Sequence, residues 1–197
     1  MLPIKTLAAV AAIAAALAPG IAHADDPLIS DTAGDATPLA VCVTWAEQGI
    51  DTCGARPLSD PTLDIVSGDL DTTGSKLVWS TTLLDLDDTA GRTYGMSARS
   101  GGADLGVRLA ADGTALVEVY KMHVGYASAP ADVVVDTATD TVTWSVPLAT
   151  LDALRAQACP ACAPIGRGSV LGDVAASTSD GRWGDGATAG RTYTIGG

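Results

Sequence analysis

Lys76-Leu77-Val78-Trp79-Ser80-Thr81-Thr82-Leu83-Leu84-Asp85-Leu86 is the longest of the runs that decide the fold. Apolar and polar side chains alternate along it, which is the period of a half-buried β-strand. Trp79 lies inside this alternation, so we expect its side chain in the core. Similar runs, rich in β-branched, aromatic or aliphatic residues, predict further strands at 63–70, 93–99, 105–110, 115–124, 133–135, 141–146, 169–177 and 192–195.

The breaks between these runs contain Asp, Gly, Ser or Thr, the residues typical of tight turns. Nearly all of the 23 acidic residues are Asp, Glu47 and Glu118 being the exceptions. Asp favours turns whereas Glu favours helices, so this bias also indicates many turns joined by strands. Short strands at this spacing predict an all-β fold, an antiparallel β-sandwich of jelly-roll or immunoglobulin-like type.

One short helix is expected to interrupt the strands at 147–157. Leu148, Leu151 and Leu154 recur there at helical spacing and share one face. Pro147 suits the first turn, where its missing N–H costs nothing. We expect this helix to cap one end of the sandwich.

The first 24 residues have the pattern of a Sec-type secretory signal peptide. Lys5 supplies a basic start, residues 7–17 are apolar, and Ala22-His23-Ala24 fits a cleavage site between small residues. No later stretch is apolar enough for a membrane span. The sequence therefore predicts a secreted or extracellular protein, with a single domain over 25–197 and a cysteine-bracketed insertion at about 39–60.

The formal net charge of −12 at pH 7 argues against nucleic acid and anionic membrane surfaces as partners, since both require basic patches.

The four cysteines fall into two close pairs, Cys42 with Cys53 and Cys159 with Cys162. In an exported chain they are expected to form local disulfides. Cys159-Pro160-Ala161-Cys162 has the spacing of a thioredoxin-type redox pair, but it follows the expected helix, whereas that chemistry needs the pair at a helix N-terminus. A Cys₄ zinc site is a further alternative, and it needs all four thiols reduced.

Few residues suggest catalysis. His123 is the one histidine beyond the signal peptide, and it is expected on a strand. No Gly-x-Ser-x-Gly elbow occurs, and the scarcity of Glu leaves no nominated carboxylate pair for glycoside hydrolysis. Trp183 follows the Asp180-Gly181 turn, so we expect it to be exposed and able to stack on a ligand, whereas Trp144, inside a strand, belongs in the core.

Two stretches suggest a metal site: Ser30-Asp31-Thr32-Ala33-Gly34-Asp35-Ala36-Thr37-Pro38 and Leu63-Asp64-Ile65-Val66. The glycine permits a tight turn in which the carboxylates of Asp31 and Asp35 converge. Such hard oxygen ligands suit Ca²⁺. A solvated turn before a strand has the same composition and is the alternative.

These two stretches, the run at 146–151 and the closing Arg191-Thr192-Tyr193-Thr194-Ile195-Gly196 together resemble secreted bacterial β-sandwich modules related to DOMON domains and family-nine-type carbohydrate-binding modules. In such modules a structural Ca²⁺ often ties the N-terminal turn to the first strand and the last hairpin. By position, the resemblance implies Asp31, Asp35, Asp64 and Asp185 as metal ligands.

Three functions follow from these observations. The first is a secreted noncatalytic binding module for a glycan or a cell-surface protein, stabilised by structural calcium and disulfides. The second is a purely structural or protein-interaction domain of the cell envelope. The third is a secreted hydrolase or redox protein that uses His123 or the Cys159 and Cys162 pair.

Overall fold

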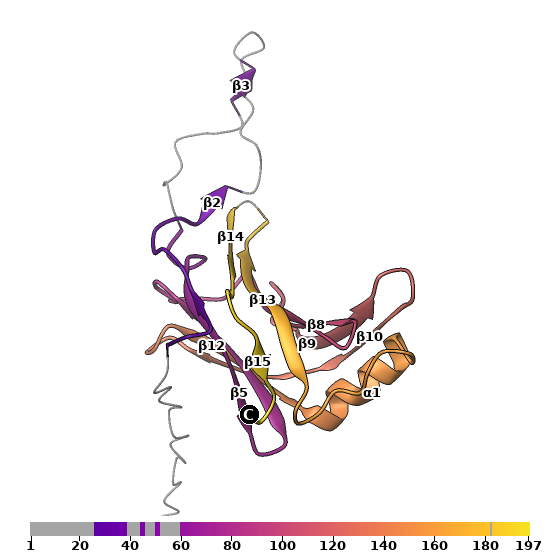
Figure 1. Cartoon of the computed structure of the whole chain (residues 1–197). Helices are drawn as coiled ribbons and strands as arrows, with labels where there is room; N and C mark the ends of the chain where they lie inside the picture. The colour runs from indigo at the N-terminus through magenta and orange to yellow at the C-terminus, as the bar shows by residue number, and fades with distance from the viewer. Residues whose placement is uncertain (1–25, 39–43, 46–49, 52–59, 182) are drawn as a thin grey trace, which may run out of the picture.

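The computed structural model describes residues 26–38, 44–45, 50–51, 60–181 and 183–197 (Figure 1). The predicted signal peptide, Cys42, Cys53 and most of the insertion expected at 39–60 lie outside the described residues. From this insertion the structure gives one strand pair, β3 (Thr44–Trp45) with β4 (Ile50–Asp51).

Two antiparallel sheets and one helix make up the rest of the described chain, which confirms the predicted all-β sandwich with one short helix. The smaller sheet has the order β1-β5-β6-β12-β11, with β1 (Ile29–Ser30), β5 (Ile65–Thr73), β6 (Lys76–Leu83), β12 (Thr141–Pro147) and β11 (Asp132–Asp136). The larger sheet has the order β10-β9-β8-β7-β13-β14-β2, with β10 (Gly125–Pro130), β9 (Ala115–Lys121), β8 (Ala103–Leu109), β7 (Thr93–Ser100), β13 (Val170–Ser179), β14 (Trp183–Thr188) and β2 (Thr37–Pro38). In addition, β15 (Tyr193–Thr194) pairs with β13.

The core lies between the inner faces of these two sheets. Trp79 and Trp144 are direct partners on β6 and β12, and both side chains are fully buried, as predicted. The larger sheet contributes Leu105 and Val107 from β8 and Val119 from β9. Buried residues recur at every second position of β6 and β8, with Val78 as an additional buried residue of β6, so the alternation in the sequence corresponds to the two faces of each strand.

The predicted helix is present as α1 (Leu148–Ala158). Leu151 and Leu154 are buried in the same core cluster as the inward residues of β9. The helix packs beside β9, β10 and β12 at one end of the sandwich (Figure 1). It therefore covers the inner face of the larger sheet at that end.

Two parts of the strand prediction are wrong. The run at 115–124 is not one strand, because β9 ends at Lys121 and a turn leads into β10. His123 lies in this turn with a φ of 62°, not on a strand as expected. Residues 125–130 and 183–188 form the strands β10 and β14, neither of which was predicted.

Candidate metal centre

The Asp31 turn lies where the chain crosses from one sheet to the other. β1 pairs with β5 in the smaller sheet, and β2 pairs with β14 in the larger sheet. The turn between them contains Gly34 at a φ of 92°, a left-handed conformation that glycine adopts without a steric penalty. The N–H of Asp31 donates to the carbonyl of Val66 at 3.0 Å, so the turn begins fixed to β5.

Asp64, the residue before β5, holds this turn by a hydrogen bond to its backbone. Its side chain is completely buried, and its Oδ2 accepts a hydrogen bond of 2.7 Å from the backbone N–H of Gly34. Its second oxygen, Oδ1, is buried and receives no hydrogen bond from any described residue. A buried carboxylate oxygen without a donor is costly, and a bound cation satisfies it.

Asp185 comes from β14 in the other sheet. Its Oδ2 accepts a hydrogen bond of 2.8 Å from the backbone N–H of Ile65, at the start of β5. On the adjacent β13, the hydroxyl of Thr178 donates to the carbonyl of Leu63. The two sheets are thus joined by side-chain contacts beside the Asp31 turn.

Three of the four predicted metal residues meet at this point. Asp31, Asp35 and Asp185 each place a carboxylate oxygen within 4.8 Å of the others. Asp64 lies outside this group, in contact with the turn that carries Asp31 and Asp35. Of the triad, Asp35 is exposed and the other two are partly buried.

The electrostatics of Asp31 reflect this crowding. Burial raises the pKa of Asp31, and the carboxylates of Asp185, Asp35 and Asp64 raise it further. The hydrogen bond from the N–H of Thr32 acts in the opposite direction. Within the described part of the chain, Asp31 Oδ2 is buried and receives no hydrogen bond. The carboxylates repel one another, and a cation that prefers oxygen ligands would relieve this repulsion, so this cluster could hold a metal ion.

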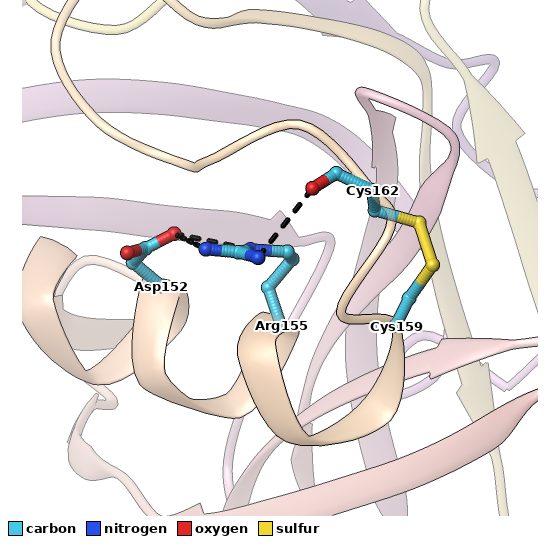
Figure 2. The surroundings of a disulfide bond; sticks show 4 residues. All are labelled: Asp152, Arg155, Cys159 and Cys162. Atoms are coloured by element: carbon cyan, nitrogen blue, oxygen red, sulfur yellow. Dashed lines mark hydrogen bonds and ion pairs between the residues drawn. A yellow bond between two sulfur atoms is a disulfide. The ribbon is translucent and has the colours of Figure 1, made fainter.

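The second predicted site, the local disulfide between Cys159 and Cys162, is present just after α1 (Figure 2). The buried guanidinium of Arg155 donates to the carboxylate of Asp152, at 2.6 Å from Nη2, and to the carbonyl of Cys162. Asp152 also accepts the N–H of Ile165 at 2.9 Å. Both cysteines are at least nine-tenths buried, and the pair follows the helix, so it has neither the exposure nor the helix N-terminus of a reactive thiol pair.

The remaining predicted site residues are Trp183 and His123. Trp183 begins β14 opposite Pro38, in a strand instead of at the tip of a turn, and its side chain lies outside the described residues. His123 is exposed, and no hydrogen bond or ion pair joins it to another described residue.

No family model, curated protein or solved structure matches the chain. Within the part of the chain that the structure describes, no helix has the length and apolar character needed to cross a bilayer.

Proposed function

We propose that the chain is an exported, noncatalytic binding module whose sandwich is stabilised by one Ca²⁺ at Asp31, Asp35 and Asp185. Asp64 supports the site by holding the turn that carries Asp31 and Asp35. The partner in this proposal is a glycan or a cell-surface protein. The disulfide at Cys159 and Cys162 agrees with an oxidising compartment outside the cytosol.

One observation carries the metal part of the proposal: carboxylates from the Asp31 turn and from β14 converge, and buried oxygens of Asp31 and Asp64 receive no hydrogen bond from any described residue. An ion there would connect the N-terminal turn to β14, and so would link the sheets at a point where the chain passes between them. Such a position suits a stabilising ion.

Calcium is favoured over magnesium by the kind of ligands present. The cluster offers carboxylates from a turn and a strand, a flexible set of protein oxygens that suits the larger ion. Mg²⁺ needs a near-ideal octahedron and usually keeps several waters. We therefore expect Ca²⁺ to bind more tightly than Mg²⁺.

The noncatalytic part of the proposal is supported by the surroundings of the two candidate reactive groups. Among the described residues, His123 has neither a nucleophile nor an orienting carboxylate hydrogen-bonded to it, whereas the histidine of a triad-type hydrolase is held between the two. The cysteine pair is buried as a disulfide.

Isothermal titration calorimetry on the chelator-treated chain tests the metal site directly. The wild-type chain should bind one Ca²⁺, and Asp35→Ala and Asp185→Asn should weaken that binding strongly. Asp136→Asn, which changes an exposed aspartate of β11, is the matched control and should leave the titration unchanged. Absence of Ca²⁺ binding, or equal losses in the control, would contradict the proposal.

A glycan array probed with the Ca²⁺-loaded chain tests the binding part. Selective retention of the chain supports a binding module. A chain that binds Ca²⁺ but no glycan and no surface protein is the structural envelope domain, which is the second function that the sequence analysis left open.

A further inference from the structure

The larger sheet carries an exposed pair of tyrosines on its outer face. Tyr120 on β9 and Tyr126 on β10 are direct partners across the two strands, so their side chains stand next to each other. Their exposed fractions are 43% and 60%. The residues that alternate with them, Val119 and Ala127, are buried in the core. The pair therefore faces solvent, and no described segment covers it.

Charged side chains surround this tyrosine pair, and each is matched by an opposite charge. The hydroxyl of Tyr126 donates to Glu118 at 2.8 Å, and Arg108 donates to the same carboxylate oxygen at 3.1 Å. In the row of Tyr120, Asp104 is its partner on β8 and accepts a hydrogen bond of 2.9 Å from Arg99 on β7. The Tyr126 hydroxyl contact restrains its ring, and Arg99 is shared between Asp104 and Asp173, at 2.9 Å from each. The charged side chains of this surface are thus paired, with one carboxylate in excess.

The neighbouring row of the same face has small residues around Glu118. Its members across β7, β8 and β10 are Ser97, Gly106 and Ser128. Among the described residues, a Cβ built on Gly106 meets only the backbone oxygen of Met96, at 3.5 Å. The surface beside the tyrosines is therefore open and lined by hydroxyl, carboxylate and guanidinium groups.

We infer that this face, defined by Tyr120, Tyr126, Glu118 and Arg108, binds a neutral polysaccharide. The inference rests on the proposed function and assigns its binding site. A sugar ring has an apolar C–H face, which suits an exposed aromatic ring, and hydroxyls at its edge, which suit polar groups placed beside that ring. The paired charges favour a neutral ligand over a cation, and the net charge of −12 disfavours a polyanion.

A protein partner is less well matched to this face. The core of a stable protein interface is apolar and largely free of charge. Here the row beyond the tyrosines consists of Ser, Gly and Glu118, whose carboxylate is paired with Arg108 of the next row. The apolar part of the surface consists of the two tyrosines and of the exposed Met122 and Val124 in the turn that joins their strands, a narrow strip beside the charged and hydroxyl groups.

Affinity electrophoresis of the Ca²⁺-loaded full chain tests the inference, with mixed-linkage β-glucan, xylan, galactomannan and dextran as neutral probes and polygalacturonate as the acidic probe. At least one neutral polysaccharide should retard the wild-type chain. Tyr120→Ala and Tyr126→Ala should each weaken binding at least about fivefold. Tyr126→Phe keeps the ring and should retain most of the binding. Val134→Ala, on an exposed position of β11, is the control and should bind like the wild type.

Gly106→Val provides an independent variant. Its added side chain occupies the open surface beside Glu118 without removing a tyrosine, and valine is favourable in a strand, so binding should fall while the melting temperature is kept.

The possible outcomes distinguish a failure of the assigned binding site from a failure of the proposed function. If a polysaccharide retards both tyrosine variants and Gly106→Val as strongly as the wild type, it binds elsewhere on the chain. That result overturns this inference alone. No retardation by any neutral polysaccharide overturns both the inference and the glycan part of the proposed function. Retardation by polygalacturonate alone overturns the assignment of a neutral ligand.

Discussion

At the scale of single residues, Gly125 shows how closely α1 packs on the sheet. A Cβ at this position would lie 2.6 Å from the carbonyl oxygen of Ala158, the last residue of the helix. The obstacle is backbone, so a side chain there cannot be accommodated by rotation. The sequence around Gly125 gives no sign of this constraint, because it arises from a residue far along the chain.

We therefore expect Gly125→Ala to destabilise the protein by about 1–3 kcal/mol, the usual range for overpacking. Gly106→Ala is the matched control, since Gly106 is also a strand glycine but its added Cβ meets nothing closer than 3.5 Å. That control should be neutral or slightly stabilising. Urea denaturation measures both free energies of unfolding, and equal values for the two variants would contradict the close approach.

At the scale of elements, α1 is held to the loop that follows it by Asp152 and Arg155 (Figure 2). The hydrogen bond from Arg155, and then the one from the N–H of Ile165, lower the pKa of Asp152. A carboxyl group whose pKa is lower in the folded state stabilises that state above the unfolded pKa, about 3.9. This contribution is lost as the pH falls through the folded pKa.

Asp152→Asn should therefore lower the melting temperature at pH 7, and its difference from the wild type should shrink as the pH falls below about 4. Thermal melts between pH 3 and pH 7 measure this, with Asp136→Asn as the control. A difference that stays constant over this range would show that the ionised form of Asp152 is not what holds the loop.

The elements that the sequence predicted are those with strong periodicity. Alternation identified β6 and β12, and the leucine spacing identified α1, because each buries one regular face. The turn at 122–124 was missed because Met122 and Val124 are typical of strands and His123 adopts a left-handed conformation without a glycine. β14 was missed because the glycines at 184 and 186 are poor strand formers, yet pairing with β13 holds them in the sheet.

At the scale of the whole molecule, the Asp31 turn connects the sheets. The spacing of Asp31 and Asp35 predicted that their carboxylates converge, since both belong to one turn. The approach of Asp185 depends on the register of β14 against β13 and β2, which local spacing does not contain. Its carboxylate meets the backbone of Ile65 across 120 residues of sequence. The family resemblance suggested Asp185, whereas periodicity alone did not.

If an ion binds this cluster, it relieves the repulsion among the three carboxylates and stabilises the folded state. Stability should rise with free Ca²⁺ as RT ln(1 + [L]/Kd), or about 2.7 kcal/mol at a hundredfold excess over Kd. Asp35→Ala should abolish this dependence, and Mg²⁺ should reproduce it poorly.

The melting temperature of the exhaustively chelated chain, measured as Ca²⁺ is added back to millimolar concentration, is the most direct test of a calcium-stabilised sandwich. If Ca²⁺ stabilises the sandwich, the melting temperature should rise in the wild type and not in Asp35→Ala. A wild-type melting temperature that is indifferent to Ca²⁺ would contradict it and leave Asp31, Asp35 and Asp185 as ordinary acidic residues at the junction of the two sheets.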